Sequence, residues 1–402
     1  LMLHGAGAAR LTAGLQYVVV NLVGSTLFLF AVGLLYAVTG TLNMADLALK
    51  VPLVAPADQA LLRTAALLLL AVFAIKAAAV PLHFWLPATY AAASPPVAAL
   101  FMIMTKVGGY AILRIYTLVF GAEAGGAAWV ALPWLLPAAL VTTVLGMVGV
   151  LASRNLRALV CYAVIGSMGT LLTAVGLFTE QAVAASLYYL IHSTIAGAAL
   201  FLLVDLIQGR RGAAGDRLAT APPFPQAELI SGLFFLAAIM MVGMPPLSGF
   251  IGKLLILDGA RTAPLANWVW AVILGTSLLA MVGFARAGSV LFWKSTAVAA
   301  EAPAPAERAA AAEPAPVASA ASHPSLPLVV TAGLLAVSVL LTAFAGPVMR
   351  ELDRTAGQLF ERTAYLTAVL GAPQAVDPAL IEPQPIGDEP IANQPLVPER
   401  VE

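Results

Sequence analysis

The stretch FAIKAAAVPLHFWLPATYAAASPPVAALFMIMTKVGGYAILR, residues 73–114, decides the fold of this protein. It is almost entirely apolar, yet it contains Lys76, Lys106 and several prolines. A bilayer core of roughly 30 Å requires about 20 apolar residues of α-helix, and this stretch is long enough to supply two such helices. It therefore predicts membrane-spanning helices that hold lysine side chains inside the membrane.

The composition of the whole chain agrees with this prediction. Of its 402 residues, 61% are hydrophobic and only 10% are charged, and the mean hydropathy is +0.94. A soluble globular protein carries roughly 25% charged residues, because its surface must be solvated. The net charge is zero, which gives no indication of a nucleic-acid partner. The composition thus excludes an ordinary soluble domain and predicts a polytopic membrane protein.

Apolar windows of spanning length recur along the chain and predict an all-α transmembrane helical bundle with about nine spans. The predicted spans are residues 16–39, 60–86, 95–120, 128–151, 156–178, 182–207, 229–257, 267–291 and 326–348.

Two of these spans contain prolines in their interior. The second span includes Pro81 and Pro87, and the seventh includes the adjacent Pro245 and Pro246. Proline lacks a backbone N–H and clashes with the preceding turn, so both helices are expected to be kinked or interrupted. In secondary transporters, broken helices mark the ion path. An ordinary proline kink is the alternative interpretation for either span taken alone.

Lysine and arginine are distributed unequally between the two sets of loops, which predicts the orientation. The more basic set is expected on the cytoplasmic side, which places the C-terminal tail outside. That set comprises Arg10, Arg154, Arg157, Arg210, Arg211, Arg217 and Lys294.

The remaining segments complete the expected organisation. Residues 1–295 form a transmembrane domain, 296–325 an Ala/Pro linker, 326–370 a last span with an amphipathic helix near 347–369, and 371–402 a Pro-rich tail. The linker and the tail have too little apolar surface to fold, so both are expected to be disordered. The chain opens on LMLHGAGAARL without Met, and we expect a truncated N-terminus.

Four titratable residues lie inside four separate predicted spans: Lys76, Lys106, His192 and Lys253. A lysine at the centre of a span costs about 2.5–3.5 kcal/mol, so these lysines are expected to face the bundle interior, water or a partner. Snorkelling of a lysine to the membrane surface is an alternative for Lys253. A buried ammonium holds its proton less tightly, and histidine titrates near neutrality. We therefore predict that these four residues transfer protons along the membrane.

Hydroxyl groups near these residues are candidates for holding bridging waters, and ordinary packing is the alternative for each. They are Thr105, Tyr162, Ser167 and Ser193. No Asp or Glu lies deep in any predicted span, so the lysines lack an acidic partner within this sequence. A buried lysine without such a partner is poorly compensated.

The sequence contains no pattern that indicates a cofactor, nucleotide or metal site. The four histidines are scattered, and the one cysteine, Cys161, lies in an apolar run and is expected to be a buried core residue. Neither a Walker loop nor a strand-borne GxGxxG is present.

Three runs carry a resemblance to a known family: residues 73–114 quoted above, LIHSTIAGAALFLLVDLI (190–207) and PPLSGFIGKLLIL (245–257). Together they resemble the antiporter-like family of Mrp-type cation/proton antiporter subunits and proton-pumping membrane-arm subunits of respiratory complex I. Within it, VTGTLNMADLA (38–48) and the lysine at position 253 are most similar to the D-type subunits of Mrp antiporters.

The resemblance implies a fourteen-helix fold with inverted repeats and two broken helices, of which this chain holds helices six to fourteen. It also implies roles for single residues. Lys76 matches the lysine of the first broken helix, Lys106 the lysine of the next helix, His192 a central-axis histidine and Lys253 the terminal ionisable residue. The glutamate that pairs with the first lysine in this family lies before residue 1. Ser167 stands where complex I relatives often carry histidine, which favours the Mrp side.

The resemblance therefore implies a subunit of a multisubunit Na⁺ or K⁺/proton antiporter in the bacterial inner membrane, with other Mrp subunits as partners. The alternative is a proton-pumping subunit of a redox enzyme, either an NADH:quinone oxidoreductase or a membrane-bound hydrogenase. A purely structural scaffold is a third hypothesis.

Overall fold

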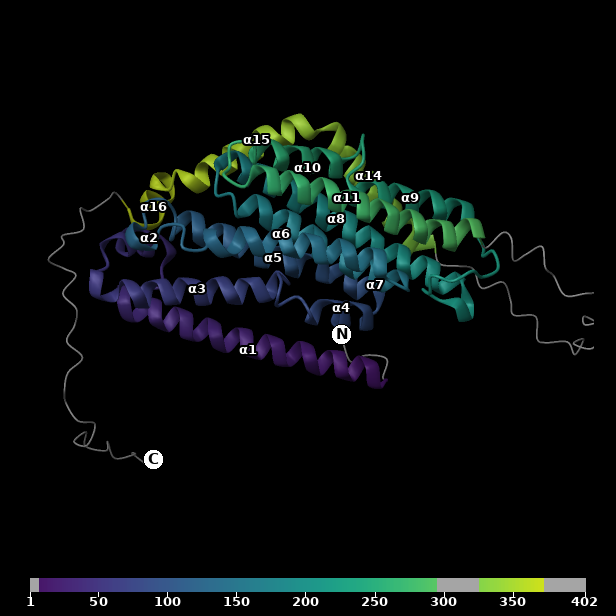
Figure 1. The fold of residues 1–402 in the computed structure, drawn as a ribbon, viewed down its shortest axis with the longest axis horizontal. Coiled ribbons are helices and arrows are strands. Elements are labelled where there is room, and N and C mark those ends of the chain that lie inside the picture. The colour runs from purple at the N-terminus through teal and green to yellow at the C-terminus, as the bar shows by residue number, and fades with distance from the viewer. Residues whose placement is uncertain (1–6, 295–324, 372–402) are drawn as a thin grey trace, which may run out of the picture.

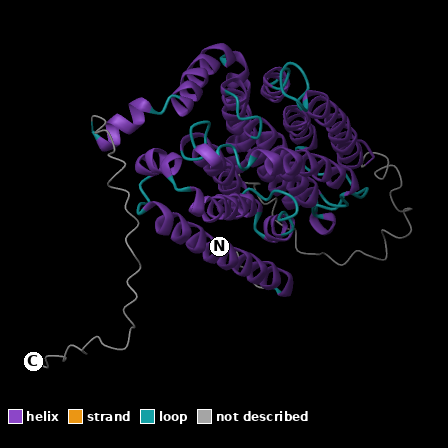
Figure 2. Ribbon diagram, turned by 60° about the vertical axis from the view of Figure 1, so that its left-hand side comes forward, coloured by secondary structure: helices purple, strands orange, loops and turns teal. Residues whose placement is uncertain are grey.

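The computed structural model describes residues 7–294 and 325–371, and within these ranges the chain is built from α-helices without a β-strand (Figures 1 and 2). This confirms the predicted all-α fold. The helices are α1 (Ala8–Thr39), α2 (Met44–Lys50), α3 (Gln59–Lys76), α4 (Trp85–Ala92), α5 (Pro95–Leu118), α6 (Leu132–Ala152), α7 (Leu156–Val175), α8 (Glu180–Arg210), α9 (Ala227–Val242), α10 (Ser248–Gly259), α11 (Ala266–Gly288), α14 (Ser325–Ala343), α15 (Ala345–Phe360) and α16 (Thr363–Leu370).

Eight of the described helices are long and apolar enough to cross a membrane. The α9/α10 pair corresponds to the remaining predicted span, so every predicted span has a helical counterpart. The helix ends differ by several residues from the predicted bounds at a number of places, and two differences change the description. Helix α1 begins eight residues earlier than expected, at Ala8, and the amphipathic segment is two helices, α15 and α16, instead of one.

The long helices lie side by side, with α1 along one edge of the bundle and α7 in its interior (Figure 1). In α7, 89% of the spanning window is buried, against 17% in α1. Helix α7 packs closely on α6. A Cβ atom on Gly146 would lie only 2.2 Å from the backbone nitrogen of Gly166, so the two backbones approach closely where Gly146 lies. Small residues at such crossings allow backbones to approach, which is how helices associate inside a membrane.

The C-terminal helices α15 and α16 run from the end of α14 to α2 at one end of the bundle (Figure 1). Ala356 and Leu359 of α15 are buried, whereas Arg350 and Glu351 are exposed. Between the two helices, Arg362 donates hydrogen bonds to the carbonyl oxygens of Ala48 and Leu118, at 3.2 and 3.1 Å. This arginine therefore ties the C-terminal segment to the ends of α2 and α5.

The linker predicted at 296–325 and the tail predicted at 371–402 lie outside the described residues, apart from Ser325 and Gly371. Their predicted disorder therefore stays a prediction, as do the domain boundaries drawn from it.

Candidate proton-transfer site

The first broken helix is the α3/α4 pair. Helix α3 ends at Lys76, and α4 begins at Trp85 after a non-helical segment that contains Pro81. Pro87 is the third residue of α4, where a helix has no internal partner for the missing N–H. A Cβ on Gly108 of α5 would lie 2.6 Å from the backbone nitrogen of Ala77, so α5 packs directly on the break.

Lys76 is half-buried, and its side chain is directed towards α1. Its ammonium group donates a hydrogen bond to the Oδ1 atom of Asn21 on that helix. The Nδ2 atom of Asn21 in turn donates to the carbonyl of Tyr17 at 2.7 Å, which fixes the amide orientation. Sequence reasoning missed Asn21, although it was detectable as a lone amide within the apolar run YVVVNLVG.

The second broken helix is the α9/α10 pair. Helix α9 ends at Val242, and Gly243 follows with a φ of 81°, a left-handed conformation that glycine adopts without strain. Pro245 and Pro246 lie between the two helices, and α10 begins at Ser248. Both proline-containing spans are thus interrupted.

Lys253 lies on α10 with only 6% of its surface exposed. Its ammonium group donates to the carbonyl oxygen of Val242 at 2.7 Å and to the Oγ atom of Ser277 on α11 at 2.8 Å. These contacts point the group into the protein, so the alternative in which Lys253 snorkels to the membrane surface does not describe this structure. Ser277 was not singled out from the sequence, because one serine in an apolar helix carries no distinctive pattern.

Lys106 and His192 lie between the two breaks, on α5 and α8, and are 2% and 0% exposed. The ammonium group of Lys106 lies 3.5 Å from the Oγ atom of Ser167 and 3.3 Å from the sulfur of Met168. The Nδ1 atom of His192 lies 2.9 Å from the Oγ atom of Ser248, the first residue of α10.

The structure places three of the four predicted residues on neighbouring helices. Helix α8, which carries His192, packs on α5, which carries Lys106, and on α10, which carries Lys253. Lys106, His192 and Lys253 thus form a row of buried titratable residues, and α3, which ends at Lys76, also packs on α5. Within residues 7–294 and 325–371, none of the three lysines forms an ion pair. Neutral oxygen atoms take the place of a carboxylate for Lys76 and Lys253.

Of the four predicted water-holding residues, Ser167 is the one that contacts a predicted proton-transfer residue, Lys106. Thr105 and Ser193 donate to backbone carbonyls three residues earlier in their own helices, at 3.2 and 3.4 Å. The ring of Tyr162 packs against Gly149, where a Cβ would lie 2.2 Å from it. The ordinary-packing alternative describes these last three residues well, and their role in holding water stays a prediction.

Two features of the site were not anticipated. The Nε2 atom of His192 and the Nδ1 atom of His83 in the first break are buried without a hydrogen-bond partner among the described residues. A groove of about 410 Å³ runs between α5 and α8 beside Lys106 and is lined chiefly by apolar residues such as Ile103, Val107 and Leu190. The candidate site therefore borders an open, apolar groove in addition to the buried row.

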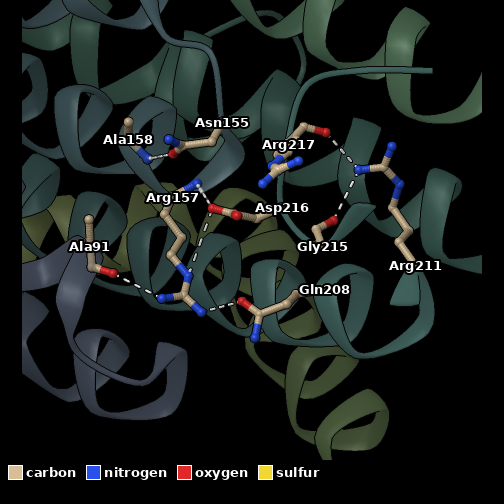
Figure 3. Close-up of polar contacts among 9 residues, drawn as sticks. All are labelled: Ala91, Asn155, Arg157, Ala158, Gln208, Arg211, Gly215, Asp216 and Arg217. Atoms are coloured by element: carbon tan, nitrogen blue, oxygen red, sulfur yellow. Dashed lines mark hydrogen bonds and ion pairs between the residues drawn. The ribbon is translucent and has the colours of Figure 1, made fainter. Parts of the chain in front are cut away.

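An arginine contacts the C-terminal end of α4, as Figure 3 shows. Arg157 on α7 donates to the carbonyl of Ala91 at 2.9 Å, lies 3.8 Å from the carboxylate of Asp216 and donates to Gln208 on α8. A cation at the C-terminal end of a helix is favourable, because the helix dipole is negative there. This contact fixes the second half of the first broken helix against α7 and α8.

The same region contains Arg211, which is 7% exposed and donates to the carbonyls of Gly215 and Arg217, as Figure 3 shows. It also donates to the carbonyl of Ala219. The loop after α8 is thus folded around a buried guanidinium. Arg154 and Arg217 lie on the loops that join α6 to α7 and α8 to α9, and Arg157 and Arg210 lie on the adjoining ends of α7 and α8.

Comparison with known proteins agrees with this architecture. Residues 2–281 match the model of the family described as "NADH:quinone oxidoreductase/Mrp antiporter, TM". The chain belongs to this family. One relative is the D-type subunit of a probable K(+)/H(+) antiporter of Rhizobium meliloti (strain 1021), which is 38% identical over 409 residues that cover 93% of this chain and 71% of the relative.

Two further relatives place the chain within the Mrp branch of the family. The D-type subunit of a Na(+)/H(+) antiporter of Bacillus subtilis (strain 168) is 36% identical over 73% of this chain and 58% of its own length. The solved Mrp complex of Dietzia sp. DQ12-45-1b contains a chain with a TM-score of 0.76 and 27% identity, covering 91% of this chain and 71% of that one. The chain therefore spans between 58% and 71% of the lengths of these relatives.

Proposed function

We propose that this chain is a subunit of a multisubunit monovalent cation/proton antiporter, in which Lys76, Lys106, His192 and Lys253 conduct protons. The observation that carries the proposal is the buried row of Lys106, His192 and Lys253 on α5, α8 and α10. Burying such groups is costly, and intramembrane ionisable residues mark ion and proton pathways. The relatives named as D-type subunits of K(+)/H(+) and Na(+)/H(+) antiporters support the same function.

In this proposal Lys76 is the switch, because it lies at the end of α3 next to the break. Lys106 and His192 relay the proton, and Lys253 is the terminal site. The other subunits of an Mrp complex are the partners, and Na⁺ or K⁺ is exchanged for H⁺. The chain would be a multi-pass protein of a bacterial inner membrane. The arginine-bearing face of Figure 3 would lie in the cytoplasm and the C-terminal tail outside.

The test of this proposal is the substitution Lys76→Ala in the chain, produced together with its complex partners. In inside-out vesicles, addition of Na⁺ or K⁺ dequenches a pH-sensitive dye when protons leave the lumen. The substitution is expected to abolish this signal while the complex still assembles, as judged by co-purification. Unchanged dequenching would refute the role of Lys76.

A second candidate is a proton-pumping subunit of a redox enzyme, because the family also includes NADH:quinone oxidoreductase subunits. The proteins that co-purify with the chain distinguish the two. Small multi-pass proteins without iron–sulfur clusters favour the antiporter, whereas NADH- or quinone-binding subunits favour the enzyme.

A further inference from the structure

The ammonium group of Lys253 is held by two neutral oxygens from two different helices. One is the carbonyl of Val242 at the end of α9, and the other is the hydroxyl of Ser277 on α11. Lys253 is 6% exposed, and no ion pair within residues 7–294 and 325–371 neutralises it. These two oxygens are therefore the means by which the protein holds this group.

The first oxygen is fixed by the broken helix itself. Val242 is the last residue of α9, and the carbonyls of a last helical turn have no partner within the helix. The stem of Lys253 lies against Gly243, where a Cβ would come within 2.8 Å of the lysine Cδ. The side chain of Lys253 is therefore in contact with the protein both at its aliphatic stem and at its amine.

The second oxygen differs from the first in one chemical respect. A carbonyl can only accept a hydrogen bond, whereas a serine hydroxyl can both accept and donate. Ser277 accepts from Lys253 and donates to the carbonyl of Ile273 at 2.7 Å. If Lys253 loses its proton, the neutral amine gains a lone pair, and the hydroxyl can rotate to donate to it. Val242 continues to accept from one of the two remaining N–H groups.

We propose that Ser277 is a positioning residue for Lys253, which holds the amine at the end of α9 in both its charged and its neutral form. The proposal rests on the proposed function, in which Lys253 takes up and releases protons. It identifies the hydroxyl of α11 as the group that allows this exchange without a carboxylate, since a fixed negative charge would favour the charged form alone.

Other titratable groups around Lys253 bear on any pH dependence. His192 on α8 lies 2.9 Å from the Oγ atom of Ser248, which is on the same helix as Lys253, and Tyr188 and Tyr189 of α8 pack near Gly252. Helices α9 and α11 carry Glu228 and Arg286, which lie about 14 and 9 residues, or roughly 20 and 13 Å, along their helices from the contacts with Lys253. The described residues of α14 include no titratable side chain. A change at Ser277 therefore acts on Lys253 and, through it, on His192.

The experiment compares Ser277→Ala and Ser277→Thr with the wild type in vesicles that contain the assembled complex. A matched control is Ser186→Ala, because Ser186 is 1% exposed and its hydroxyl donates to the carbonyl of Val183, in its own helix. Ser277→Ala is expected to lower the antiport rate about tenfold, since a hydrogen bond to a charged group is lost. Its pH profile should move to lower pH, because the ammonium keeps one acceptor instead of two. Ser277→Thr and Ser186→Ala should retain the wild-type rate and profile.

A second measurement does not depend on transport. The thermal midpoint of the purified complex is determined for Ser277→Ala, Lys253→Met and the double variant, and coupling between the two sites appears as non-additivity. Additive shifts would overturn the positioning role, as would a Ser277→Ala variant that transports like the wild type. Non-additive shifts in a complex whose wild type exchanges no cation would instead refute the proposed function and leave the positioning role intact.

Discussion

Both broken helices bring a lysine to the C-terminal end of their first half, but the two lysines lie on opposite sides of the break in the sequence. Lys76 is itself the last residue of α3, before the break. Lys253 follows the break on α10 and extends back to the last carbonyl of α9. The C-terminal end of a helix carries a partial negative charge, which stabilises a cation there. A broken helix thus supplies part of the compensation for which a buried lysine otherwise needs a carboxylate.

The two lysines differ in how completely they are enclosed. Lys76 is half-buried and bonded to the amide of Asn21, whereas Lys253 is almost fully buried and bonded to Val242 and Ser277. The first break therefore leaves its lysine partly accessible, and the second fixes its lysine tightly. This difference agrees with a switch at Lys76 and a terminal site at Lys253.

The largest expected effect comes from Lys76→Arg and Lys253→Arg, which retain the positive charge at each break. Arginine cannot release its proton under physiological conditions, so both variants are expected to lose antiport by more than about tenfold if proton release is required. Cation-induced dequenching in vesicles measures the loss. The exposed Lys294, six residues after the end of α11, provides the control, because Lys294→Arg should leave the rate unchanged. Wild-type rates in either break variant would show that a fixed charge is sufficient there.

An intermediate effect is expected from Gly243→Ala in the second break. The added Cβ would lie 2.8 Å from the Cδ of Lys253, at a residue whose φ is 81°. Overpacking costs about 1–3 kcal/mol and a left-handed backbone at a residue other than glycine costs about 1–2 kcal/mol, so the thermal midpoint of the complex should fall. The matched variant is Ala78→Gly in the first break, where Ala78 has a φ of 53°. Glycine suits that conformation, so the midpoint should stay the same or rise. Equal losses in both variants would contradict the assignment of a tighter fit to the second break.

The smallest effect is expected from Asn21→Leu, which removes the partner of Lys76. Because Lys76 is half-buried, water can replace the lost amide. Antiport in vesicles should therefore fall a few-fold, less than in Ser277→Ala. A loss as complete as that of Lys76→Ala would show that Lys76 depends on Asn21 as strongly as Lys253 depends on its own partners, and would remove the contrast between the two breaks.

Local sequence patterns were sufficient for a large part of this picture. The apolar windows of about 20 residues predicted the helical bundle, and Pro81, Pro245 and Pro246 predicted where two helices break. Both predictions succeed because hydropathy and a missing amide donor are local properties of the chain. The charge deficit made Lys76, Lys106, His192 and Lys253 conspicuous before any contact was known. The pairing of an isolated polar residue with a distant helix could not be read in this way. Ser248 and Ser277 resemble ordinary residues of apolar helices, and a detectable lone amide such as Asn21 does not reveal its partner.

The sequence by itself determined that the chain crosses a membrane and that three lysines and a histidine lie within it, because the cost of burying charge depends only on residue type and position in a span. Only the tertiary structure decided what compensates those charges. The carbonyl of Val242, the amide of Asn21 and the hydroxyls of Ser167 and Ser277 come from helices that are separate in the sequence and adjacent in space. Packing brings them together, and packing is a property of the whole bundle.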